Sequence, residues 1–355
     1  MQSTTEFIKK HKGTIVVSFA VSLFLIFIVS FVVGLNDILE VLSQTNVYII
    51  LLTLVLELII MMFWTERWRL ILDVLHSAPS FKQLTLMLYA SVFGNNVTPG
   101  AAGGEPLRAY LLSKFENIPF ETGFASATTD RVFEFFPFVL VSTLTAYLIF
   151  TLNIGFITSL VVSIMVILTM VFFGLMIYVG YNKEVSTRII LSITRRIFPY
   201  VKKLTSRDIS FTNLKDKLVG YIDTFTFGFQ GVLRDHRMFI LGVFISFLMW
   251  GIDNLRFYLT FVALGYHPPI IPMIIIYTVC ILVSILPTLP GSLGIREGVM
   301  VALFLPVGVP ADVVLAVSLL DRLVTYIMPT FVGAAATFYY GRKYQSKKAS
   351  PGANV

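Results

Sequence analysis

Two Gly- and Pro-rich segments of the chain combine a helix break with an acid and an arginine. The first reads TPGAAGGEPLRAY from Thr98, and the second reads LPGSLGIREGVMV from Leu289. A helix that starts at such a break points backbone N–H groups toward it, and this arrangement suits a phosphate. Polar side chains next to the break can satisfy the irregular backbone. The start of the helix after the first break therefore suits a phosphate, and the candidate substrate-binding residues of this segment are Asn95, Asn96, Thr98, Gly103, Gly104, Glu105 and Arg108.

The helix expected after each segment carries an Asp-Arg dipeptide. These are Asp130-Arg131 and Asp321-Arg322, and each Asp lies 31 residues after the proline of its segment. Neighbours on a helix do not face each other, so every one of these four charges needs a partner elsewhere. The symmetric solution pairs Asp130 with Arg322 and Asp321 with Arg131. The alternative leaves the two arginines for a lipid phosphate.

Further charges complete the candidate substrate-binding set. Glu134 lies one turn after Asp130, and Thr325 stands at the matching position of the second half. An unbalanced acid in a span indicates either proton or cation coupling or an ion pair with Arg108 or Arg131. Two close pairs, Glu105 with Arg108 and Arg296 with Glu297, are expected either to hold the breaks as internal ion pairs or to contact substrate. The remaining candidates are Asp130, Arg131, Glu134, Gly294, Arg296, Glu297, Asp321 and Arg322.

Signals for catalysis are poor. The sequence has no HExxH and no CxxC, its four histidines are scattered, and GAAGGEP lacks the lysine of a phosphate loop. Its longest segment between spans, residues 182–237, is far shorter than the roughly 100 residues of a typical domain. We therefore expect no catalytic residue, no metal and no cofactor.

Composition places these residues in a membrane protein. Hydrophobic residues make up 56% of the 355 residues, and charged residues make up only 13%, against roughly 25% in an ordinary globular protein. Such a chain cannot cover a soluble surface, whereas lipid needs no polar cover. The single cysteine, Cys280, also excludes a disulfide scaffold.

The predicted fold class is an all-α polytopic membrane protein with about six full spans plus two re-entrant hairpins. Residues 83–115 and 270–306 contain the two Gly- and Pro-rich breaks, and each has a second leg of about ten residues, too short to cross a bilayer. They therefore read as hairpins that enter and leave on one side. The six expected spans cover residues 14–34, 46–64, 122–150, 154–181, 238–264 and 311–340.

Charge decides the orientation. Residues 182–237 hold eleven Lys or Arg against five acids, and the N-terminus and the tail are also basic. By the positive-inside rule all three are cytoplasmic. Six spans with both hairpins re-entrant place them on one side. The predicted location is the cell membrane, multi-pass, with both termini cytoplasmic.

The equal spacing in the two halves predicts an inverted repeat. In this topology the first hairpin enters from the cytoplasm and the second from outside, an architecture that transporters use with the binding site at the repeat interface. The alternative is an old duplication with purely architectural breaks. The expected organisation is one membrane domain over residues 1–345, with repeats at about 46–150 and 238–340, the basic segment at about 182–237, and a disordered tail at 346–355.

The basic segment also predicts the partners. Its apolar residues Val185, Ile189, Ile193 and Ile197 recur at near-helical spacing among Lys and Arg, which is typical of an interfacial helix on anionic headgroups. The alternative is a solvated linker. We expect membrane lipids as partners, chiefly anionic phospholipid, and no nucleic acid. A homo-oligomer and a separate lipid-modifying enzyme are open alternatives.

The motifs together resemble a known family. NNVTPGAAGGEPLRAYLL, ATTDRVFEFFPF, LPTLPGSLGIREG and SLLDRLVTYIMP are similar to the flippase-like family that includes the membrane domain of lysylphosphatidylglycerol synthases. The resemblance covers nearly the whole chain. It implies an α-helical domain that moves phospholipid or lipid-linked headgroups across a bilayer, without the cytosolic synthase domain of the two-domain relatives.

The leading hypothesis is therefore a lipid flippase or transporter. One alternative is a membrane-embedded enzyme acting on a lipid phosphate or polyprenyl-linked sugar, with Glu105, Glu134 or Glu297 as general base. Another is a secondary transporter of a small solute that resembles the DedA group in its hairpins. A lipid substrate demands a lateral opening between helices, and a solute does not.

Overall fold

The computed structural model is helical throughout the residues it describes. These residues are 35–98, 103–152, 156–204, 211–285, 292 and 294–349. The expected span 14–34, the Pro-Gly dipeptides of both breaks and residues 350–355 lie outside the described residues. The all-α class is confirmed for the described part of the chain.

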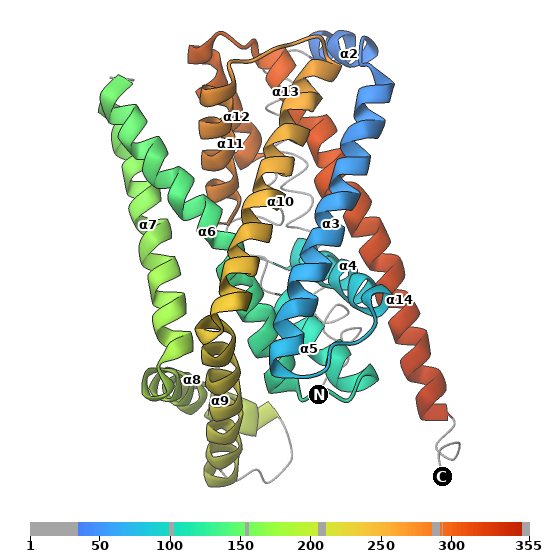
Figure 1. Ribbon diagram of the computed structural model, residues 1–355, viewed down its shortest axis with the longest axis vertical. Helices are drawn as coiled ribbons and strands as arrows, with labels where there is room; N and C mark the ends of the chain where they lie inside the picture. Colours follow the sequence, from blue (N-terminus) through green and yellow to red (C-terminus); the bar gives the residue numbers. More distant parts are fainter. Residues whose placement is uncertain are drawn as a thin grey trace.

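The first half contains a long helix, a short-helix hairpin and a second long helix. After α2 (Leu35–Ser43), α3 covers Val47–Leu75, α4 covers Phe81–Val97, α5 covers Gly104–Phe115 and α6 covers Phe120–Leu152. Asn46 begins α3 by accepting hydrogen bonds from the backbone N–H groups of Tyr48 and Ile49. The legs α4 and α5 lie in the lower half of Figure 1.

The second half has the same order of elements. α10 covers His236–Ala263, α11 covers Ile270–Ile285 and α12 covers Ile295–Phe304, and a 3-10 turn follows at Leu305–Val307. α13 (Ala311–Arg322) leads through a π-helical turn, η4 (Leu323–Ile327), into α14 (Met328–Ala349). α11 and α12 lie at the upper end of Figure 1, opposite to α4 and α5. α14 extends into the segment expected to be a disordered tail.

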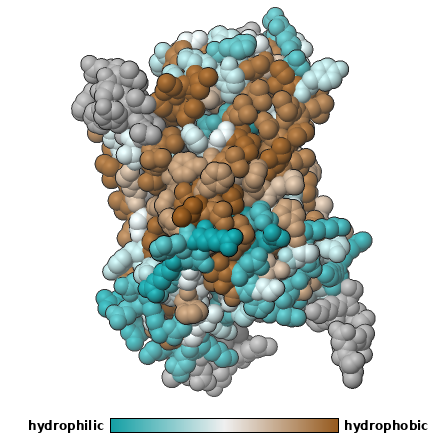
Figure 2. Space-filling model, viewed as in Figure 1, coloured by the Kyte–Doolittle hydropathy of each residue, from teal (hydrophilic) through white to brown (hydrophobic). Residues whose placement is uncertain are grey.

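Between the halves the chain forms α7 (Phe156–Tyr181), α8 (Lys183–Leu204) and α9 (Phe211–Arg234). α7 descends beside α6, and α8 is seen end-on across its lower end (Figure 1). Ile189 and Ile193 of α8 are exposed. Figure 2 shows apolar surface over the middle of this face and hydrophilic surface gathered at the lower end, over α8 and α9. This distribution suits a bilayer around the middle of the molecule.

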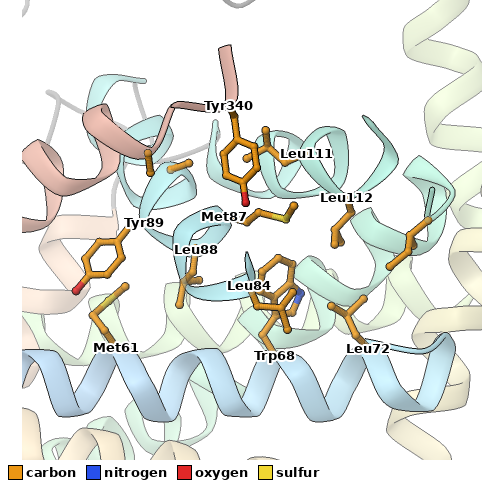
Figure 3. Close-up of a cluster of buried hydrophobic side chains, with 13 residues drawn as sticks. Met61, Trp68, Leu72, Leu84, Met87, Leu88, Tyr89, Leu111, Leu112 and Tyr340 are labelled. Atoms are coloured by element: carbon orange, nitrogen blue, oxygen red, sulfur yellow. The ribbon is translucent and has the colours of Figure 1, made fainter. Parts of the chain in front are cut away.

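Two described helices, α3 and α10, are long and apolar enough to cross a membrane. They run in opposite directions and pack against each other along the centre of the molecule (Figure 1). The first hairpin packs against α3 and α14 through a cluster that includes Trp68, Leu88, Leu112 and Tyr340 (Figure 3). The two halves therefore meet at α3–α10 and again at α4–α14.

The contact between α4 and α14 depends on Gly333. A Cβ atom added there would lie 2.2 Å from the backbone oxygen of Tyr89 and 2.8 Å from the Cβ of Phe93. Backbone cannot move aside as the end of a flexible side chain can, so the two helices can approach this closely only with glycine at this position.

We expect Gly333→Ala to lower the Tm in detergent by roughly 3 °C or more, because α14 must move away from α4. The matched control is Gly341→Ala on the same helix, where an added Cβ meets no atom within 4 Å. Alanine favours a helix by about 1 kcal/mol over glycine, so the control is expected to be neutral or stabilising. Equal Tm changes in the two variants would contradict the close contact.

Candidate functional site

Asp130 forms the centre of a buried ion-pair network in the first half. This fully buried residue of α6 accepts hydrogen bonds from Arg67 Nε at 2.7 Å, Arg108 Nη1 at 2.8 Å and Trp64 Nε1 at 2.6 Å. The Arg108 guanidinium also lies about 5 Å from the rings of Trp64 and Trp68. α3, α5 and α6 thus converge on one carboxylate.

Asp321 holds the equivalent position in the second half. It is fully buried in α13 and accepts hydrogen bonds from Arg256 Nη1 at 2.5 Å and Arg296 Nη2 at 2.8 Å. Arg256 also donates to Asp253 at 2.7 Å and to the hydroxyl of Tyr277 at 3.0 Å. α10, α12 and α13 therefore converge on Asp321 as α3, α5 and α6 converge on Asp130.

The arginine of each Asp-Arg dipeptide pairs with an acid of the preceding short helix. Arg131 Nε donates to Glu105 at 2.6 Å and its Nη1 donates to Glu134 at 3.1 Å. Arg322 Nε donates to Glu297. We call these two sets the first and the second network. The first contains Arg67, Arg108, Asp130, Glu105, Arg131 and Glu134, and the second contains Arg256, Arg296, Asp253, Asp321, Glu297 and Arg322.

The expected crossed pairs, Asp130 with Arg322 and Asp321 with Arg131, are wrong. Each Asp is neutralised within its own half by two arginines from neighbouring helices. A carboxylate with both oxygens already taken by adjacent guanidiniums has no need of a distant partner. The expected internal pairs are wrong as well: Glu105 pairs with Arg131 and Arg108 with Asp130, whereas Arg296 pairs with Asp321 and Glu297 with Arg322.

Arg67 is not among the residues that the sequence predicted, and the nearby Arg69 lies outside the first network. Arg69 is 41% exposed and pairs with Glu66 on its own helix. A better signal is the ten-residue spacing Glu57 to Arg67, which recurs as Ser246 to Arg256.

The residues of these two pairs contact each other where α3 packs against α10. Arg67 Nη1 donates to Ser246 Oγ at 2.7 Å, and Arg256 Nε lies 3.5 Å from Glu57 Oε2. Arg67 therefore contacts the residue ten positions before Arg256, and Arg256 contacts the residue ten positions before Arg67. Because the helices are antiparallel, the two contacts are related by an approximate two-fold arrangement with one difference, Glu57 against Ser246.

Three amides at the described edges of the breaks are already hydrogen-bonded within the protein. The N–H of Gly103 donates to Thr98 Oγ1 at 2.9 Å, that of Gly104 donates to Asn95 Oδ1 at 2.6 Å, and that of Gly294 donates to Glu297 Oε2 at 2.7 Å. The expectation of free N–H groups pointing at a phosphate is therefore contradicted at these three amides.

Asn96 also has a structural contact, because its side chain donates to Thr330 Oγ1 on α14 at 2.7 Å. Asn95, Asn96 and Thr98 therefore fix the end of α4 against α5 and α14. Gly294 adopts a positive φ of 85°, as the break requires.

A polar cavity of about 370 Å³ lies between the two networks. Of the residues predicted from sequence, only Glu134 and Arg296 line it. Helices from both halves contribute to its wall. The lining residues are Glu57, Ile60, Trp64, Arg67, Glu134, Phe138, Ser246, Met249, Trp250, Asp253, Tyr277, Ile281, Ser284, Arg296 and Thr325.

Three buried donor atoms on residues of this wall have no partner among the described residues. They are Arg67 Nη2, Arg296 Nε and Trp250 Nε1. Arg67 is 1% exposed and Arg296 is 8% exposed. Unpaired buried donors are costly, and two that belong to cations, one from each network, suit an anionic ligand. No three His, Cys, Asp or Glu side chains form a metal-binding group in the ranges that the structure covers.

An apolar helical body with buried ion pairs and a polar central cavity defines an integral membrane protein. Residues 15–333 match the family model described as the lysylphosphatidylglycerol synthase TM region, and the chain belongs to this family.

The chain is 49% identical to a UPF0104 membrane protein of Methanothermobacter thermautotrophicus, over 97% of this chain and 98% of that protein. It is 29% identical to a UPF0104 membrane protein of Methanocaldococcus jannaschii over 96% and 98%. It is also 28% identical to one of Pyrococcus horikoshii over 84% and 89%.

The ion pairs predict a specific pattern of coupling. Asp130→Asn should cost on the order of 3 to 5 kcal/mol, because it strands two buried guanidiniums, and Arg108→Gln should cost less, because Asp130 keeps its ion pair with Arg67. The double variant should lose less than the sum of the two losses by about 1 kcal/mol or more. Chemical denaturation of the purified variants measures this difference.

The control cycle combines Asp130→Asn with Arg322→Gln, which belong to different networks. Their losses should add within about 0.5 kcal/mol. Strong coupling in this cycle, with additivity between positions 130 and 108, would restore the crossed pairing and contradict the structure.

Proposed function

We propose that this protein moves a phospholipid or lipid-linked headgroup across the membrane through the central cavity. The headgroup phosphate binds at Arg67 and Arg296. The observation that carries the proposal is the pair of unpartnered guanidinium nitrogens on residues that line one cavity, each from a different network. The phosphate would supply the acceptor oxygens that the protein leaves out.

The two halves act as an inverted repeat in this proposal. The support is geometric: each half places a short-helix hairpin at opposite ends of the molecule (Figure 1), and each Asp binds one arginine from the long helix and one from the hairpin. Inverted repeats around a midplane site allow alternating access, with one half moving against the other. Arg67–Ser246 and Arg256–Glu57 lie on the moving interface.

Transport of a headgroup through the cavity also accounts for the charged and hydroxyl side chains that line it. Its basic groups suit a phosphate, and its hydroxyls from Ser246, Ser284 and Thr325 suit the polar part of a headgroup. The acids Glu57, Glu134 and Asp253 lie on the same wall, so a headgroup with both phosphate and donor groups finds partners for each.

The first experiment tests transport directly. The protein is reconstituted in vesicles with fluorescent phosphatidylglycerol, and both leaflet change and covalent change of the lipid are measured. We expect leaflet change without covalent change. A new lipid product would favour the membrane-embedded enzyme. The absence of both leaflet change and covalent change with several lipid classes would contradict the proposal.

Thr325→Leu should lower the leaflet change about tenfold, corresponding to roughly 1.4 kcal/mol on the limiting step, because the larger side chain enters the cavity. Thr143→Leu is the matched control: Thr143 is exposed on α6 and also donates to the carbonyl four residues before it. It should leave the rate unchanged. Equal rates in both variants would remove the cavity from the path.

We also propose six spans with both termini and residues 182–237 on the cytoplasmic side. In a Cys280→Ser background, Lys217→Cys should react with an impermeant thiol reagent only from the cytoplasmic side, and His267→Cys only from outside. Both positions are exposed, at opposite ends of the molecule. External labelling of Lys217→Cys would overturn the orientation.

A further inference from the structure

A second cavity lies at the lower end of the molecule, away from both networks. It has a volume of about 640 Å³, is open on one side, and is lined by the start of α6, the end of α7, and helices α8 and α9. Glu121 is the only charged residue among the described residues that line it, and the others are mainly aromatic and aliphatic. Its walls therefore offer an apolar ligand many contacts and few hydrogen bonds.

Aromatic rings form one wall of this cavity. The rings of Phe120 and Phe124 are stacked with centroids 6.0 Å apart, and Phe124 lies 5.7 Å from Phe225 of α9. Apolar side chains around an empty cavity lose dispersion contacts that a filling group would restore. In a bilayer the abundant molecules with the right chemistry are lipid hydrocarbon chains.

The helices around the cavity are fastened to one another, so the space is part of the fold. Gln230 Nε2 donates to the backbone oxygen of Tyr181 at 2.6 Å, and Arg234 Nε donates to its hydroxyl at 2.8 Å. Lys183 of α8 pairs with Asp223 of α9. These contacts hold the end of α7 to α9 and α8 to α9.

Two exposed lysines of α9 flank its lining face. Lys215 lies three residues before the lining residue Leu218, and Lys217 lies four residues before the lining residue Tyr221, so one lysine stands on each side of the face, about one turn before it. Both lysines are exposed. Residues 182–237 together hold eleven Lys or Arg against five acids. An apolar cavity next to exposed lysines complements a molecule with a hydrocarbon chain and a negative headgroup.

We propose that this cavity binds one hydrocarbon chain of an anionic membrane phospholipid, whose phosphate contacts Lys215 and Lys217. This site differs from the central cavity in place and in chemistry. This second cavity binds the hydrocarbon chain of a lipid rather than its headgroup. A lipid bound there anchors α8 and α9 to the membrane surface. The inference does not depend on transport through the central cavity.

The test uses full-length protein in vesicles that contain phosphatidylglycerol with a photoreactive diazirine in its hydrocarbon chain. After irradiation, mass spectrometry maps the labelled residues. In the wild type we expect Phe120 and Phe225 to be labelled about tenfold more than Leu168, an exposed residue of α7 outside the cavity. Equal labelling at the three positions would overturn the proposal without any variant.

A filled cavity provides the second arm. Val179→Trp places a large ring in the space and should lower labelling at Phe225 about tenfold, whereas Leu168→Trp on the same helix should not. If Val179→Trp does not fold, Ile190→Trp fills the cavity from α8. Unchanged labelling at Phe225 in a folded, filled variant would overturn the proposal. The proposal would also be overturned if the cavity of the wild type took no lipid label and Val179→Trp converted a dimer into a monomer, because the occupant would then be a second copy of the protein.

The rim is tested separately. Lys215→Gln with Lys217→Gln should remove the preference of the site for labelled phosphatidylglycerol over labelled phosphatidylcholine. Lys82→Gln, an exposed lysine at the start of α4, is the control and should keep the preference. A preference that survives the double change would contradict the assignment of the phosphate.

Discussion

The rest of the structure depends on keeping two aspartates ionised inside an apolar body. A buried carboxylate is tolerated only when it is paired and hydrogen-bonded. Asp130 and Asp321 each receive two guanidiniums, and each pair of guanidiniums comes from a long helix and a short hairpin helix. The requirement therefore fixes three helices in each half at one point, and the hairpins are held in place by charge as well as by packing.

The two halves use this solution with different residues. In the first hairpin Glu105 precedes Arg108, and in the second Arg296 precedes Glu297, yet the arginine binds the aspartate and the glutamate binds the arginine of the dipeptide in both. The reversed order matters little because both helices turn an acid and a base toward the same neighbours. The two halves therefore share the same set of contacts, although the acid and the arginine follow in a different order in their sequences.

The cavity occupies the place where the networks leave donors unused. Its position between α3 and α10 puts it on the surface along which the two halves could move. Glu57 and Ser246 occupy equivalent positions there, so the second network faces an additional acid that the first lacks. The two sides of the cavity are consequently unequal in charge.

The sequence by itself determined the all-α class, most of the long helices and the two hairpins. Apolar runs of spanning length and the short second legs predict the α4–α5 and α11–α12 hairpins, because length and hydropathy are local properties. It also picked out Asp130 and Asp321 as charges that need partners. The count of six spans and the repeat remain inferences from spacing and charge.

Only the tertiary structure decided which partners those charges take and where a ligand fits. Arg67 and Arg256 stand more than sixty residues from their aspartates in sequence, and apart from the ten-residue spacing from Glu57 nothing in the local pattern distinguishes Arg67 from Arg69. The structure separates them, since one arginine is 1% exposed in the network and the other 41% exposed on the surface. The sequence offered polar side chains for the irregular backbone of the first break, and only the structure assigns Thr98 to the N–H of Gly103, Asn95 to that of Gly104 and Glu297 to that of Gly294. Pairing depends on which side chains packing brings within about 3 Å, and a sequence records spacing along the chain, not distance across it.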